Sequence, residues 1–136
     1  MLKKIDHIGI AVSSLSESVP VFQKMGLSYL GEEEVAEQKV KVAFFDIGGV
    51  HIELLEPTAP DSPIAIFLEK KGQGIHHLAL ESDGLEQEIN QLISNGISMI
   101  DMKPRTGAHN SKIAFIHPKS SAKVLTELCE HCSEGH

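Results

Sequence analysis

The feature that most constrains the fold is a short histidine-bearing strand pattern that occurs twice. Residues 5–10 read Ile-Asp-His-Ile-Gly-Ile, and residues 75–80 read Ile-His-His-Leu-Ala-Leu. Both stretches alternate with the two-residue period of a half-buried strand. Each is followed by a helical pattern and then by strands that end in Glu-Leu. This recurrence predicts one structural unit used twice in the chain.

The residues after the first histidine strand predict a helix and three further strands. Ser14, with Glu17 three positions later, is typical of a helix N-cap, and Gly26 ends the helical pattern. Pro20 is expected either to delay the start of this helix or to bend it. Gly48-Gly49 predicts a hairpin turn between the last two strands. Strands are predicted at 27–30, 40–46 and 50–55, with a charged turn at 31–34.

The residues after the second histidine strand predict the same order of elements. Ser62 and Pro63 first open a short helix that continues to Lys71, within a connecting segment at about 57–73. Asp83 is then predicted to cap a helix, with Glu86 at the capping-box position, and Asn95-Gly96 ends it. Strands are predicted at 75–80, 97–100, 112–117 and 124–129, with a loop at 104–111. The expected order is therefore β-α-β-β-β twice.

The two halves can be aligned residue by residue. His7 and His77 are 70 positions apart, Glu53 and Glu127 are 74 apart, and residues 52–56 align with 126–130. A longer loop at 105–110 and a turn at 118–123 account for the difference of four. We expect a single α+β domain of 136 residues, with modules at about 1–56 and 74–136 joined by the connection at 57–73.

Four polar residues occupy matching positions in the two halves: His7, Glu53, His77 and Glu127. Modules paired about a pseudo-two-fold axis would bring them to one cleft, and two imidazoles with two carboxylates suit a divalent metal ion. On an octahedral ion they leave two adjacent positions, where a substrate with two oxygens can chelate. A single histidine or glutamate in a strand is usually structural, so the shared positions carry this prediction.

Other histidines and both cysteines lie close in sequence to these four residues. Strand alternation puts His76 and His77 on opposite faces, and alignment with His7 selects His77. His51 shares a face with Glu53 and is interpreted as a pocket or surface residue. The tail Cys129-Glu130-His131-Cys132 with His136 resembles a metal-binding segment, but terminal segments are usually mobile, and we expect no structural zinc there.

Charge and hydropathy exclude several classes of partner. The formal net charge of −7 argues against nucleic acid or an anionic membrane surface. No apolar run approaches the ~18 residues that span a membrane. Residues 1–4 lead straight into a strand pattern, which predicts no signal peptide. Two cysteines so close together form no useful crosslink, so we expect a cytoplasmic protein.

The chain resembles the methylmalonyl-CoA epimerases of the vicinal oxygen chelate superfamily over nearly its whole length. The resemblance lies in residues 5–12, 52–57, 60–65, 74–79, 114–120 and 124–128. It implies the glyoxalase-like fold, in which two paired βαβββ modules form a curved mixed sheet around a metal cleft. The segments 107–109 and His117-Pro118-Lys119-Ser120 point to the epimerase more specifically.

The resemblance implies interconversion of (2R)- and (2S)-methylmalonyl-CoA by removal of the α-proton through a metal-stabilised enolate. The family's ligands fall on His7, Glu53, His77 and Glu127, and Glu127 is also the family's favoured base. One divalent ion is expected (cobalt, manganese, nickel, zinc or magnesium). Lys112, Lys119 and Ser120 are expected to contact the coenzyme A portion. The expected partners are methylmalonyl-CoA and a second copy of the chain, as a homodimer.

One departure and three alternatives stay open. Some relatives carry a second catalytic glutamate where this chain has Val42, so the acid on the opposite face could be Glu53, a water on the metal, or His51. A glyoxalase I-type lyase or isomerase acting on a thiol adduct is disfavoured by residues 117–120. An extradiol-type dioxygenase needs only three protein ligands and iron. A non-enzymatic drug-binding protein of the same fold needs no metal.

Overall fold

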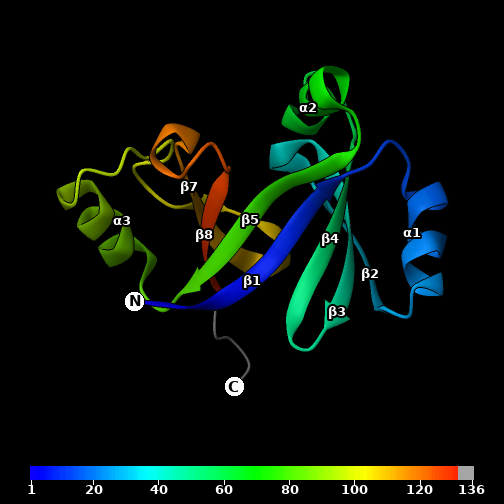
Figure 1. Ribbon diagram of the computed structural model, residues 1–136, viewed down its shortest axis with the longest axis horizontal. Helices are drawn as coiled ribbons and strands as arrows, with labels where there is room; N and C mark the ends of the chain where they lie inside the picture. The colour runs from blue at the N-terminus through cyan, green and yellow to red at the C-terminus, as the bar shows by residue number, and fades with distance from the viewer. Residues whose placement is uncertain (132–136) are drawn as a thin grey trace. The chain divides into compact units, whose positions relative to one another are not determined.

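The structure, a computed structural model, describes residues 1–131 and has an α+β fold (Figure 1). Its strands are β1 (Leu2–Ala11), β2 (Ser28–Val35), β3 (Val40–Ile47), β4 (Val50–Pro57), β5 (Gly74–Ser82), β6 (Arg105–Thr106), β7 (Ser111–Ile116) and β8 (Thr126–His131). Its helices are α1 (Leu15–Lys24), α2 (Pro63–Lys71) and α3 (Leu85–Ser94), with 3-10 turns at Ala36–Gln38, Ala108–Asn110 and Pro118–Ser120. The predicted α+β class is confirmed.

The chain divides into two compact units, each described by itself. The N-terminal unit comprises residues 7–76. The C-terminal unit comprises residues 1–6 together with the described residues from His77 onward. Strand β1 is thus shared, because its first residues, through Asp6, group with the C-terminal unit.

In the N-terminal unit, the strand order is β2-β3-β4-β1. β1 and β4 run parallel, while β2, β3 and β4 are antiparallel neighbours. Gly48 and Gly49, with φ of 61° and 86°, form the predicted turn between β3 and β4, and positive φ at both central residues gives a turn whose twist matches the strands. The structure also confirms α2, with Ser62 as N-cap and Pro63 in its first turn.

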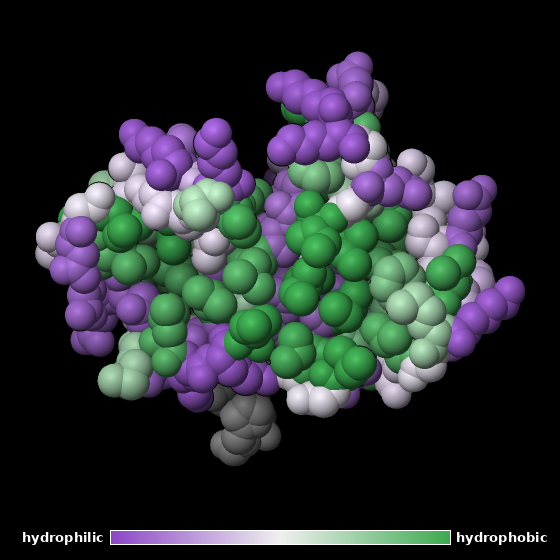
Figure 2. All heavy atoms as spheres, in the orientation of Figure 1, coloured by the Kyte–Doolittle hydropathy of each residue, from purple (hydrophilic) through white to green (hydrophobic). Residues whose placement is uncertain are grey.

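Helix α1 covers one face of this sheet. Ser14 is its N-cap, with Oγ accepting from the Glu17 N–H at 3.3 Å, and Pro20 lies inside the helix. The helix packs through buried residues that form one core: Val12, Leu15, Val19, Ala43, Phe45 and Leu54. Apolar side chains also gather where Figure 1 draws β4 and α1, in keeping with the partly buried Ile10, Phe22, Leu27 and Ile52 (Figure 2).

The predicted charged turn at 31–34 is wrong, because β2 continues through these residues to Val35. Its glutamates pair with β3, Glu33 lying opposite Val42, after a register shift between Tyr29 and Gly31. β2 stands at the end of this unit's strand order. Charged side chains suit such a position, since they discourage pairing with another strand.

In the C-terminal unit, the strand order is β5-β8-β7-β6. β5 and β8 run parallel, as β1 and β4 do in the N-terminal unit, and the remaining pairs are antiparallel. Helix α3 covers one face, with a core of Leu85, Ile89, Ala114, Ile116 and Leu128. Leu128 and Leu54 hold equivalent places in the repeat, and both are fully buried.

Three local predictions in the C-terminal unit are wrong. Asp83 does not cap α3, because Gly84 is the N-cap residue and the Asp83 carboxylate accepts from the Met1 ammonium instead. Residues 97–100 form no strand beyond an isolated bridge from Met99 to Ile116. The Asp101 carboxylate accepts the Phe115 N–H at 2.8 Å, which removes a donor that a neighbouring strand would use. The predicted loop at 104–111 contains the short β6 and the first residue of β7.

Within the described part of the chain, no helix combines the length and the apolar character needed to cross a membrane.

Candidate functional site

In the N-terminal unit, His7 and Glu53 lie together on the sheet face opposite α1. β1 and β4 are parallel neighbours, and Glu53 lies across from Gly9, two residues after His7. Gly9 has no side chain to compete with the carboxylate for this face. His7 Nδ1 is 3.3 Å from Glu53 Oε2, and the two residues are only 5% and 7% exposed. Phe44 of β3 lies across from Glu53 on the other side.

The C-terminal unit repeats this arrangement with His77 and Glu127. β5 and β8 are parallel, and Glu127 lies across from the small residue Ala79. His77 Nε2 is 3.2 Å from Glu127 Oε1, and the residues are 6% and 5% exposed. Phe115 of β7 lies across from Glu127, and its ring meets the His77 ring edge-on at 5.9 Å. Each unit therefore buries one imidazole–carboxylate pair beside a phenylalanine.

The donor sets and spacings of both pairs fit a metal ion. Charge-assisted hydrogen bonds of this kind usually measure ~2.7–2.9 Å, shorter than the 3.2 and 3.3 Å found here. Two nitrogen or oxygen ligands at about 2.0–2.2 Å from one ion lie roughly 3.0–3.4 Å apart. Buried carboxylates are costly unless a cation or donor compensates them. His7 with Glu53, and His77 with Glu127, could each supply two ligands.

Two further histidines, His76 and His51, lie close in sequence to the paired residues and contact phenylalanine rings. His76 packs its ring edge-on against Phe67 of α2, with centroids 5.0 Å apart, so the structure pairs His77 rather than His76 with Glu127. His51 is the register neighbour of His7 and shares the sheet face of Glu53. Its ring lies 6.2 Å from that of Phe44. Val42 is buried and lies across from Leu55.

The three residues expected to contact coenzyme A differ in their surroundings. Lys112 is exposed, and its register position beside Glu130 puts it on the α3 side of the sheet, opposite Glu127. Lys119 is exposed in the turn at 118–120, and its backbone N–H donates to His117 Nδ1 at 3.1 Å. Ser120 Oγ accepts from the Ser98 N–H at 2.9 Å, which gives this hydroxyl a structural role.

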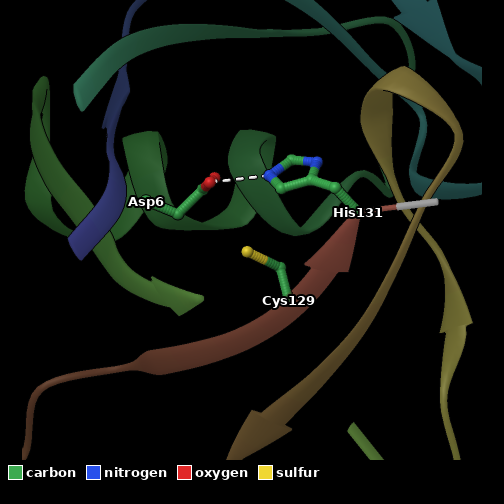
Figure 3. A group of neighbouring side chains, drawn as sticks. All are labelled: Asp6, Cys129 and His131. Atoms are coloured by element: carbon green, nitrogen blue, oxygen red, sulfur yellow. Dashed lines mark hydrogen bonds and ion pairs between the residues drawn. The ribbon is translucent and has the colours of Figure 1, made fainter. Parts of the chain in front are cut away.

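A second polar cluster was not predicted from the sequence. Asp6, Cys129 and His131 lie together in the C-terminal unit, and His131 Nε2 is 2.6 Å from Asp6 Oδ1 (Figure 3). Cys129, which the sequence placed at the end of a predicted strand and at the start of a tail expected to be mobile, is a buried residue of β8. Burial, followed by the nearby carboxylates of Asp6 and Glu127, raises the pKa of its thiol. Cys132 and His136 lie outside the described residues.

Comparison with known proteins places the chain in a family. Residues 6–115 match the model of the Glyoxalase/Bleomycin resistance protein/Dioxygenase superfamily. The chain is 46% identical to the uncharacterised protein YqjC of Bacillus subtilis, covering 99% of this chain and 97% of that protein. It is 36% identical to the mitochondrial methylmalonyl-CoA epimerase of Dictyostelium discoideum, covering 93% of this chain and 78% of the relative.

A solved structure agrees with these relatives. A variant of the Streptomyces coelicolor methylmalonyl-CoA epimerase, in complex with 2-nitronate-propionyl-CoA, matches with a TM-score of 0.93 and 34% identity. The match covers 98% of this chain and 97% of that one. These findings confirm the resemblance inferred from the sequence. The chain belongs to the Glyoxalase/Bleomycin resistance protein/Dioxygenase superfamily and, within it, to the methylmalonyl-CoA epimerase family.

Proposed function

We propose that this protein is a metal-dependent epimerase that interconverts (2R)- and (2S)-methylmalonyl-CoA. The observation that carries the proposal is the pair of equivalent, buried imidazole–carboxylate sites, His7 with Glu53 and His77 with Glu127, in a chain of this family. The proposal requires the two units to form one domain in which all four side chains converge on a single divalent ion. A bound divalent ion supplies Lewis-acid stabilisation of negative charge that develops on substrate oxygens.

Glu127 is proposed to move the proton. The acidic hydrogen of methylmalonyl-CoA lies between a carboxylate and a thioester, and its removal leaves a delocalised anion that can be reprotonated from either face. Glu127 is a carboxylate in a nearly closed environment, held beside His77 and across from Phe115. These neighbours fix its orientation, so that Oε1 or Oε2 takes the α-proton and exchanges it with solvent between turnovers.

The acid for the opposite face is proposed to come from the N-terminal unit. Val42 carries no titratable group, whereas Glu53 and His51 share one face of that unit's sheet. Carboxyl and imidazole groups are both common general acids in enzymes. Glu53→Gln and His51→Gln, each assayed with both epimers in deuterated water, distinguish them: in the variant that lacks the acid, the epimer deprotonated by Glu127 should still exchange its α-proton while inversion is lost.

The relatives support methylmalonyl-CoA as the substrate. The Streptomyces coelicolor protein is described with 2-nitronate-propionyl-CoA, and a nitronate spreads its negative charge over a planar group much as an enolate does. For the coenzyme A portion, the exposed ammonium group of Lys119 is the proposed contact to phosphate, with Ser120 beside it in the turn, whereas Lys112 lies on the face of the sheet away from Glu127. We further propose that the active form is a homodimer, which light scattering of the purified chain tests.

The experiment is proton exchange in deuterated water. Metal-replete protein incubated with methylmalonyl-CoA is expected to add one deuterium at the α-carbon, as followed by mass spectrometry. Chelation is expected to stop the exchange, and re-addition of cobalt, manganese, nickel, zinc or magnesium in turn is expected to identify the ion that restores it. Absence of exchange in a metal-replete sample would overturn the proposal. Turnover of a glutathione hemithioacetal instead would favour the glyoxalase I-type alternative.

A further inference from the structure

A cluster of three different metal-binding side chains lies outside the proposed epimerase site. It consists of Asp6, Cys129 and His131. One ligand atom from each residue lies within 4.8 Å of the others. In Figure 3, the Asp6 carboxylate and the His131 ring point toward each other, and the Cys129 sulfur lies on the same side of β8 as the ring. We propose that these three residues form a separate binding site for Zn²⁺ or a similarly thiophilic divalent ion.

The placement of the three residues follows from strand geometry. Cys129 and His131 are two positions apart in β8, so both side chains leave the same face of the strand. Asp6 comes from β1, which brings a residue 125 positions away into contact with His131. Two of the ligands are therefore fixed by one strand and the third by another. A site on regular strands holds its donors more precisely than a site on loops.

The donor set favours zinc over the hard cations. Thiolate, imidazole and carboxylate are all common zinc ligands, whereas magnesium and calcium take oxygen donors. A thiolate and a carboxylate together carry two negative charges, which match a divalent cation. Glu81, the register neighbour of Cys129 on β5, adds a further carboxylate nearby. Zinc binding transfers the thiol proton to solvent, so the bound state holds sulfur as thiolate.

Burial is graded across the cluster in a way that suits an accessible ion. Cys129 is 1% exposed and packs with Ile113 and Phe115. The His131 side chain is 41% exposed and that of Asp6 is 11% exposed, so the cluster opens to solvent on the histidine side. A fourth ligand, such as water, can enter there. Three protein ligands with one open position are a common zinc arrangement, whereas purely structural zinc sites are closed by four protein ligands.

The present spacing indicates how the site would adjust. The 2.6 Å separation of His131 Nε2 and Asp6 Oδ1 is that of a hydrogen bond. Two ligands on one tetrahedral zinc ion lie about 3.3 Å apart. Zinc would replace this hydrogen bond and separate the two groups by several tenths of an ångström. His131 ends β8, where such a shift disturbs little of the sheet.

The test uses cobalt(II) as a spectroscopic probe of the full chain after removal of bound metal. A cobalt–thiolate bond gives a near-ultraviolet charge-transfer band, which cobalt bound only by histidine and glutamate lacks. The wild-type protein is expected to show the band, and zinc is expected to displace it. Cys129→Ser should abolish the band. His131→Ala and Asp6→Asn should each weaken cobalt binding by about tenfold or more, the least that a supporting residue of a metal site contributes.

Two control variants make the result specific. Cys132→Ser should keep the band, which assigns the thiolate to Cys129, and His77→Asn should keep it too, which separates this site from the proposed epimerase site. Circular dichroism checks that each variant is folded, and His131→Ala tests the site even if Cys129→Ser does not fold. The proposal is overturned if the wild type shows no band, if the band survives in Cys129→Ser, or if it is lost in Cys132→Ser or His77→Asn.

Discussion

The Glu130 carboxylate of β8 accepts a hydrogen bond from the backbone N–H of Leu85, the first residue of α3, at 2.9 Å. The equivalent residue in the N-terminal unit, Glu56 of β4, accepts from the N–H of Leu15, the first residue of α1, at 2.6 Å. In each unit, the strand that carries the candidate metal-ligand glutamate also supplies a hydrogen-bond acceptor to the start of the helix. That acceptor satisfies a backbone N–H that has no partner within the helix. A carboxylate also complements the positive end of the helix dipole.

We predict that Glu130→Ala lowers the free energy of unfolding by about 1–2 kcal/mol, the usual cost of losing a helix cap. Glu56→Ala should cost a similar amount, because its carboxylate makes the equivalent contact with α1. Urea unfolding followed by circular dichroism measures both. Glu130→Gln keeps a hydrogen-bond acceptor and should lose less. Glu86→Ala, at an exposed first-turn position of the same helix, is the matched control, and equal losses in Glu86→Ala and Glu130→Ala would contradict the capping role.

These contacts also show why part of the fold could not be predicted from the sequence. β3, β4 and their Gly48-Gly49 turn follow local rules, as do Ser62 and Pro63 at the start of α2. The start of α3 does not, because its N–H acceptor comes from Glu130, 45 residues away. The local pattern therefore favoured Asp83 wrongly. The length of β2 was missed for a related reason, since its glutamates are accommodated by an edge position that only the sheet order reveals.

The candidate site residues were also only partly predictable from the sequence. The repeat alone led to His7, Glu53, His77 and Glu127, because a duplicated unit places equivalent side chains on equivalent strand faces. Strand parity also separated His77 from His76. The cluster at Asp6 could not be anticipated, because it joins residues 125 positions apart. The only sequence signal was the spacing of Cys129 and His131 at alternate positions, and their nearness to the end of the chain argued against it.

The two buried leucines at equivalent core positions give a second prediction. Leu54 and Leu128 are both fully buried, under α1 and α3 respectively. Leu54→Ala and Leu128→Ala should each lower the free energy of unfolding by about 2–5 kcal/mol, because truncation removes packing and leaves a cavity. Val124→Ala, at an exposed position before β8, should change it by less than about 0.5 kcal/mol. Denaturant unfolding measures all three, and a loss in either core variant as small as in Val124→Ala would refute the packing described.

The ion pair between Lys39 and Asp61 gives a prediction about pH. It joins the end of the turn at 36–38 to the segment before α2. The hydrogen bond from Lys39 lowers the pKa of Asp61 below its ordinary value of 3.8. A carboxyl group whose pKa is lower in the folded state stabilises the fold above the unfolded pKa, and this contribution is lost as the pH falls through the folded pKa.

Asp61→Asn should therefore be slightly less stable than the wild type at neutral pH, and the difference should shrink below about pH 4. Because both side chains are largely exposed, the effect should be small and should weaken with added salt. Thermal unfolding across about pH 3–7 measures it. In a Lys39→Met background, Asp61→Asn should no longer lower stability, whereas in a Glu69→Gln background, which changes an exposed residue of α2, it still should. A difference that grows as the pH falls would contradict the assignment.

The adjacent histidines of β5 provide the sharpest test of the proposed site. His77 is buried 3.2 Å from Glu127, whereas His76 packs against Phe67. His77→Asn should reduce deuterium exchange by at least about 10–100-fold and lower the amount of metal retained at the histidine–glutamate site. His76→Asn, one residue away on the other strand face, should keep both close to wild type and alter only the contact with α2. Exchange assays and metal analysis on the same samples decide between them. If His76→Asn lost exchange and metal while His77→Asn kept them, the face assignment of β5 and the ligand set built on it would both be wrong.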